Sequence, residues 1–351
     1  MLASNGPDDR YRAGTADPRQ GRPPGGGPGP SGGRGRAPGR APGNGPKGSG
    51  PAGSGKAPGR RGKERGPDRR SGRRPGGPPE PVVPIRRGLS IALAGFALLL
   101  AFGLVIGSQA TQIGFTVVLF GVQVFFVLAW TVASRPPSPA VTASVGVLTA
   151  AASCVAVNIP VEASLVPVGY VIAGAFGASV IAQLAVRGGR AGVTESLGVT
   201  TMVVVGVTAL STFAVLSRQP LGDQVMLAGL AAVAVGIATA RICDVISPSP
   251  RITPQVPRGS TGIIAGAMAG TAAGAVAGLL VDGMSTFEGA VAGMVAVLVA
   301  VVVDLGTGYA EAGRKLEGDA PFMWLARHLQ GPVGAFAFAA PVLYVVGVIL
   351  R

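Results

Sequence analysis

Two aspartates stand at the ends of long apolar stretches and are the side chains best placed to do chemistry. Asp244 closes the run in ARICDV, and Asp304 lies in VVVDLGTGY. Carboxylates acting with phosphate oxygens and water are the usual ligands of Mg²⁺, so the pair is a candidate metal site. The alternative is two residues at the membrane surface that are solvated or paired with Arg241. An ionised aspartate costs about 2.5–3.5 kcal/mol at mid-membrane and less near the surface, so depth alone does not decide between the two readings.

The segment from Pro248 to Gly262 combines basic side chains with the start of an apolar run. Its prolines exclude a long helix. Arg258 and Ser260 offer a cation and a hydroxyl just ahead of a helix whose first amides favour an anion. The segment is therefore either a phosphate-binding loop or a plain basic connection between two membrane spans, and the plain connection is favoured.

A second polar stretch runs from Glu311 to Gly334. Its basic pair, Arg314 and Lys315, is a further candidate for binding phosphate. Asp319 and His328 are the other side chains of this stretch that could take part in chemistry. The mixture of charged and aromatic residues predicts an amphipathic segment at the membrane surface.

These side chains are carried by a succession of apolar runs. The first, LSIALAGFALLLAFGLVIG, is long enough to cross a bilayer, because about 20 helical residues at roughly 1.5 Å each span the hydrocarbon core. Similar runs recur to the C-terminus, which predicts an all-α, polytopic integral membrane protein with about nine transmembrane helices. The third and eighth runs are short, so one of them could be partly re-entrant. The expected spans are 89–107, 113–133, 141–157, 165–186, 196–216, 225–246, 262–281, 289–305 and 331–350.

Small and polar residues inside the spans predict how the helices pack. Glycines recur every fourth residue from Gly262 to Gly278, which places a glycine stripe on one helix face and predicts close approach to a neighbouring helix. Gln123 and Gln183, inside the second and fourth spans, are expected to bond to neighbouring helices rather than to a substrate.

The chain divides into a tail, residues 1–87, and a membrane domain, residues 88–351. The tail holds 19 of the 30 Lys and Arg residues and 6 of the 16 Asp and Glu residues, a net charge of +13 within a total of +14. It is rich in Gly, Pro and Arg and nearly free of large apolar side chains, so it is expected to be disordered. It lacks the apolar core of a cleavable signal peptide. Its charge suits an anionic lipid surface or nucleic acid, although Tyr11 is its only aromatic residue.

The basic residues also predict an orientation. With the tail in the cytoplasm, nine Lys and Arg residues of the membrane domain fall on the cytoplasmic side and two on the other. This positive-inside bias places a multi-pass protein in the inner (cytoplasmic) membrane with its N-terminus inside. The nine are Arg135, Arg187, Arg190, Arg241, Arg251, Arg258, Arg314, Lys315 and Arg327, and the two are Arg218 and Arg351.

Several enzyme classes lack their defining residues. The two cysteines, Cys154 and Cys243, have no metal-type spacing, and His328 is the single histidine. The P-loop, zincin and serine-hydrolase motifs are missing from the sequence.

The order of polar features between Gly222 and Tyr344 resembles the bacterial CTP:phosphatidate cytidylyltransferase (CDP-diacylglycerol synthase) family. Asp244 stands where that family ends a span in a D-x-x-A-Y stretch, although the Ala-Tyr is missing here. Pro257, Arg258 and Ser260 look like the Pro, first Lys and Thr of the loop S-P-K-K-T-x-E-G, with Gly259 at the second Lys and the Glu missing. In the family, Gly-Asp and then Lys-Arg follow two spans later, and here Gly306-Thr307 leads to Arg314-Lys315. The stretch F-A-A-P-V-x-Y, from Phe338 to Tyr344, looks like the start of the family's last helix.

The departures fall on the carboxylates that the resemblance implies for metal binding. Thr307 stands at one such position, and Gly331-Pro332 stands where the family has Asp-Arg. Asp319 and His328 match a further Asp and His only with shifted spacing. In the family these carboxylates would hold the metal that neutralises the CTP triphosphate, so the resemblance implies a shared fold more than a shared activity.

The sequence therefore favours a divergent, non-catalytic relative that binds lipid or nucleotide or joins a membrane complex. An active cytidylyltransferase that makes CDP-diacylglycerol is the first alternative, with Asp244 and Asp304 as replacement Mg²⁺ ligands and Arg258 and Ser260 on phosphate. Mg²⁺ is expected only in that case. A small-solute transporter is the second alternative, which lacks a charge at mid-depth or an inverted repeat to support it. Membrane lipids are the expected partners, together with a second copy of the chain in a homodimer.

Overall fold

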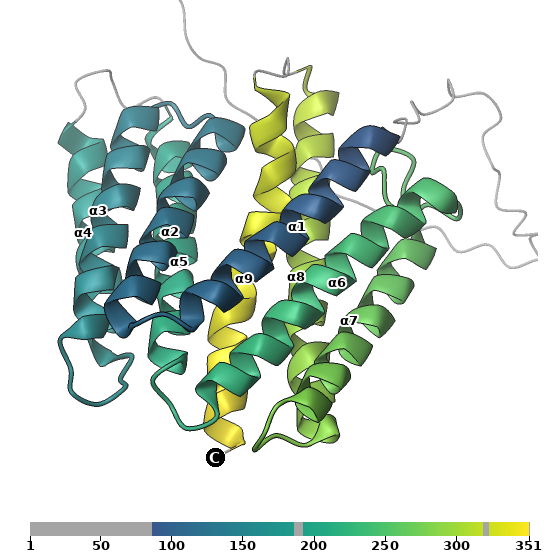
Figure 1. Ribbon diagram of the computed structural model, residues 1–351. Coiled ribbons are helices and arrows are strands. Elements are labelled where there is room, and N and C mark those ends of the chain that lie inside the picture. The colour runs from purple at the N-terminus through teal and green to yellow at the C-terminus, as the bar shows by residue number, and fades with distance from the viewer. Residues whose placement is uncertain (1–85, 186–191, 319–322, 351) are drawn as a thin grey trace, which may run out of the picture. The chain divides into compact units, whose positions relative to one another are not determined.

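The computed structural model describes residues 86–185, 192–318 and 323–350, and over these residues it is all helical (Figure 1). Nine helices of the described residues are long and apolar enough to cross a membrane, which confirms the predicted fold class of a multi-pass membrane protein. They are α1 (Arg87–Ser108), α2 (Gln112–Ser134), α3 (Pro139–Asn158), α4 (Val166–Ala185), α5 (Val193–Leu216), α6 (Gly222–Ile246), α7 (Ser260–Leu280), α8 (Thr286–Leu316) and α9 (Trp324–Ile349). The expectations for the tail fall on residues 1–85, and those for Asp319 on 319–322, which lie outside the described residues.

The nine described helices form two groups joined by α9. Helices α2 to α5 pack together on one side, and α6, α7 and α8 pack together on the other, with α1 along α6 (Figure 1). Helix α9 contacts α5 and α2 in the first group and α8 in the second. The core is correspondingly apolar, with Phe126, Phe213 and Phe336 fully buried. Large apolar side chains elsewhere are exposed on the outer helices, as a lipid environment requires.

The eighth span differs from its expected length. The apolar run ends near Leu305, but α8 continues to Leu316 and, with 31 residues, is the longest of the described helices. It begins with a capping box, in which Ser285 and Glu288 satisfy each other's backbone amides. Its last turns are polar and are supported by a Glu311–Lys315 pair one helical turn apart. At about 1.5 Å per residue, α8 is about 46 Å long, so it can extend beyond a hydrocarbon core of about 30 Å.

The ninth span also starts earlier than expected. Helix α9 begins at Trp324 and contains both Pro332 and Pro341, so the described residues between the expected eighth and ninth spans, 306–318 and 323–330, are largely helical. The segment between α6 and α7 is non-helical, as its prolines predict.

The glycine stripe of α7 packs as expected. A Cβ atom built on Gly266 would lie 2.6 Å from the carbonyl oxygen of Gly236 in α6, and one on Gly274 would lie 2.5 Å from that of Gly289 in α8. The stripe therefore lets α7 touch the backbone of α6 along one half and of α8 along the other.

Buried amides join the helices of the first group. Gln123 donates to the carbonyl oxygen of Val207 at 2.9 Å and to the Ser211 hydroxyl at 2.7 Å. Gln183 donates to the Thr200 hydroxyl at 3.1 Å. Both glutamines thus bond to α5, which confirms the expectation that they serve helix packing.

Candidate functional site

Asp244 lies near the C-terminal end of α6, and its carboxylate faces the start of α7. It accepts hydrogen bonds from Arg258 Nη1 at 2.8 Å and from the backbone N–H of Gly259 at 2.9 Å. Its side chain is 2% exposed. The N-terminus of a helix favours an anion, and at α7 the Asp244 carboxylate of the same chain is that anion.

The loop between α6 and α7 folds back on itself and turns Arg258 inward. Arg251 and Gly259 pair as an isolated antiparallel bridge, and the Ser260 N–H donates to the carbonyl oxygen of Pro250 at 3.0 Å. Val256, a residue of this loop, is buried. The Ser260 hydroxyl also donates to the Pro250 carbonyl, at 3.3 Å, so its bond in this structure is to the loop.

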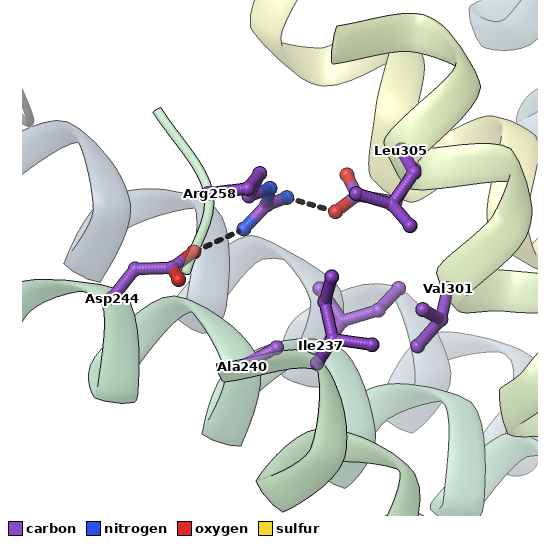
Figure 2. Close-up of a pocket in the computed structure, with 8 residues that line it drawn as sticks. Ile237, Ala240, Asp244, Arg258, Val301 and Leu305 are labelled. Atoms are coloured by element: carbon purple, nitrogen blue, oxygen red, sulfur yellow. Dashed lines mark hydrogen bonds and ion pairs between the residues drawn. The ribbon is translucent and has the colours of Figure 1, made fainter. Parts of the chain in front are cut away.

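Asp304 lies on α8 and completes a chain of alternating charges. It accepts a hydrogen bond from Arg241 Nη2 of α6 at 2.7 Å and a second from Arg258 Nη2. Arg258 therefore lies between the two carboxylates, with one guanidinium nitrogen on each (Figure 2). The order is Asp244, Arg258, Asp304, Arg241, and we call these four residues the ion-pair network.

Two positions singled out by the family resemblance lie against Asp304. A Cβ atom built on Gly331 of α9 would contact Asp304 Oδ1 and would lie 3.0 Å from the Thr307 hydroxyl. The Thr307 hydroxyl donates to the backbone carbonyl oxygen of Asp304 at 3.0 Å. There is no room for a carboxylate side chain at Gly331 while Asp304 keeps this position.

The ion-pair network is electrically balanced and closely packed. Two carboxylates face two guanidinium groups, so their formal charges cancel. The pKa of the Arg258 guanidinium is lowered to about 9, first by burial and then by the charge of Arg241, against the opposing effect of Asp244. The group is thus positively charged at neutral pH. The cavity beside it, between α6 and α8, has a volume of about 10 Å³, close to what one water molecule needs.

A second cluster gathers on the last turns of α8 and the start of α9. Glu311 Oε1 lies 2.6 Å from Lys315 Nζ, and Glu311 Oε2 lies 3.6 Å from Nδ1 of His328. Arg314 lies in the same last turn of α8. Lys315 is the more exposed member of its pair, with 40% of its side chain open. The structure thus brings Arg258 and Ser260 to one place and Lys315 and His328 to another.

The residues present do not fit the Mg²⁺ site that the resemblance implies. Among the described residues, no group of three or more His, Cys, Asp and Glu side chains could hold a metal ion. Oxygens of Asp244 and Asp304 that would bind the ion accept hydrogen bonds from guanidinium groups. Each carboxylate is engaged by two protein donors.

The sequence indicated the members of the network but not their pairing. Arg258 was a candidate for binding phosphate, in a segment for which a plain basic connection was favoured, and Arg241 was the alternative partner of either aspartate. The structure pairs Arg241 with Asp304, in agreement with that alternative. The signal that could have indicated the pairing of Arg258 is burial, because a carboxylate taken out of water requires a partner cation, and Arg258 precedes a helix packed on Asp244. Neither protein-family models nor curated protein sequences give a match to this chain.

Proposed function

We propose that this multi-pass membrane protein has the architecture of a phosphatidate cytidylyltransferase but does not transfer nucleotides, and that it binds anionic lipid at its basic end. The observation that carries the proposal is the position of Arg258, which donates to both Asp244 and Asp304. These are the two carboxylates that would have to bind Mg²⁺ in an active enzyme.

Electrostatics argues against metal-assisted transfer at this place. Phosphoryl transfer depends on cations that neutralise the triphosphate and align it with the attacking oxygen. A metal ion held by Asp244 and Asp304 would have to displace Arg258 and leave it buried beside a second cation. A ligand pocket usually measures about 300–1,000 Å³, far more than the cavity of about 10 Å³ found here.

The lipid part of the proposal rests on the end of α8. Its last turns extend beyond the apolar run, and they carry Arg314 and the exposed Lys315. A Lys or Arg near an anionic membrane surface contributes about 1 kcal/mol of attraction. We place this end on the cytoplasmic side of a bacterial inner membrane, together with the basic connections on the same side. Anionic headgroups would meet it there.

The first test is CTP- and Mg²⁺-dependent formation of CDP-diacylglycerol by the purified protein in mixed micelles. A bacterial phosphatidate cytidylyltransferase assayed in parallel is the positive control. We expect no product. Turnover by the wild type that Asp244→Asn abolishes would show that the protein is an active enzyme and would overturn the proposal.

The second test compares binding of phosphatidic acid and phosphatidylcholine to the full chain by native mass spectrometry. We expect preference for phosphatidic acid, reduced about five-fold in Lys315→Gln, since 1 kcal/mol corresponds to that factor. Lys315→Arg, which keeps the charge, is the matched control and should bind as the wild type does. Equal binding by Lys315→Gln and wild type would refute this site.

A further inference from the structure

We infer that the guanidinium group of Arg258 is the built-in cation of the Asp244–Asp304 carboxylate pair and stands in for a divalent metal ion. The inference uses the same residues as the proposed function. Its test reads stability rather than turnover or lipid binding, so the two proposals can fail separately.

The geometry matches the shape of a guanidinium. Arg258 donates from Nη1 to Asp244 Oδ2 at 2.8 Å and from Nη2 to Asp304 Oδ2, so the two ends of one planar fork serve two different helices (Figure 2). The fixed donor geometry of Arg suits such bridging, whereas a flexible ammonium is a point charge. A metal ion between two carboxylates makes the same kind of bridge.

Burial makes this bridge necessary for charge balance. The side chains of Arg258, Asp244 and Asp304 are 5%, 2% and 8% exposed. Without the Arg258 charge, the two carboxylates of the ion-pair network would face one guanidinium group of that network, Arg241, which leaves the network with an excess of one negative charge. Buried charges of this kind require compensation, and carboxylate oxygens are hard ligands that favour Mg²⁺, Ca²⁺ or Mn²⁺.

Among the described residues, Arg258 is the cation that hydrogen-bonds to Asp244, and Arg241 acts on Asp244 as a nearby charge. The other hydrogen-bond partner of Asp244 is the neutral N–H of Gly259. A short apolar side chain at position 258 would leave the volume of the guanidinium beside both carboxylates. We therefore expect loss of Arg258 to convert a metal-independent pair into one that gains stability from a divalent cation.

The experiment measures the thermal unfolding midpoint of the full chain in detergent after treatment with a chelator. Wild type, Arg258→Met and the double variant Asp244→Asn/Arg258→Met are each compared with and without Mg²⁺, Ca²⁺ or Mn²⁺ at constant ionic strength. Arg258→Met should unfold at a lower temperature than wild type and should regain about 3 °C or more with a divalent cation. Wild type and the double variant should shift by less than about 1 °C, because one has its cation and the other lacks a ligand.

Arg258→Met without a cation response would overturn the inference, as would a wild-type midpoint that falls on chelation. Should Arg258→Met not fold, Arg258→Gln replaces it with the same expected response. Whichever variant folds, the unfolding midpoint of the wild type also tests the inference. A divalent ion required by the native carboxylate pair would reveal itself as a midpoint that falls when a chelator removes the ion.

Discussion

Neutralising Asp304 tests whether the ion-pair network carries stability. Its carboxylate accepts from Arg241 at 2.7 Å and from Arg258, and its side chain is 8% exposed. Asp304→Asn keeps the size of the side chain but leaves two guanidinium groups facing the one carboxylate of Asp244. Removing one partner of a buried ion pair costs about 3–5 kcal/mol, so we expect a loss of stability in that range.

Lys315→Gln provides the matched control for this prediction. Lys315 and Glu311 form an equally short pair, at 2.6 Å, but Lys315 is 40% exposed. Exposed pairs contribute about 0–1 kcal/mol, so the control should unfold nearly as the wild type does. Unfolding by denaturant in detergent, followed by far-ultraviolet circular dichroism, measures both variants. Equal stability of Asp304→Asn and Lys315→Gln would refute the reasoning.

A double-mutant cycle separates the ion pairing from other effects of the substitution. Adding Arg241→Gln to Asp304→Asn restores charge balance, because Arg258 and Asp244 then remain as one pair. The double variant should be more stable than the sum of the single losses predicts, with a coupling of about 1.5 kcal/mol or more. If the losses of stability in the two single variants simply add in the double variant, Arg241 and Asp304 contribute to stability independently of each other.

Three further predictions concern packing, topology and the tail. Gly270→Ala should destabilise the protein by about 1–3 kcal/mol, because its Cβ would lie 2.6 Å from a backbone carbonyl of α6, whereas Gly103→Ala, with nothing within 4 Å, should be neutral or stabilising. A reporter inserted after Lys315 should be cytoplasmic and one after Arg351 external, and finding both on one side would contradict nine crossings. Residues 1–80 should be protease-sensitive and should bind anionic vesicles less as salt rises, while binding unchanged in high salt would contradict an electrostatic role.

The helices could be predicted from the sequence because apolar runs report burial in lipid directly. All nine expected spans correspond to helices, with ends shifted by a few residues except at α8 and α9. The spans expected for α8 and α9 are shorter than the helices because hydropathy is low after Leu305 and before Gly331. A helix does not need apolar residues once it leaves the hydrocarbon core, and the Glu311–Lys315 pair supports it there.

The site could be predicted only as a set of residue types. Asp244, Asp304 and Arg258 were identified from their places beside apolar runs, but which atoms meet depends on how α6, α7 and α8 cross. Arg241 illustrates the difficulty, because it precedes Asp244 by three residues on the same helix and yet pairs with Asp304 on α8. Sequence separation gives no information about such a choice between two acceptors.

The charge network and the close packing of the helices depend on each other at this end of the protein. A Cβ atom on Gly262, the first glycine of the α7 stripe, would lie 2.5 Å from Asp244 Oδ1, and one on Gly331 would contact Asp304 Oδ1. Each carboxylate is thus flanked by a glycine, which lets a backbone come close enough to keep bulk water away from it. Exclusion of water strengthens the attraction to Arg258 but raises the cost of leaving either carboxylate without a cation. The same small residues that bring the helices together therefore make the bridging arginine necessary.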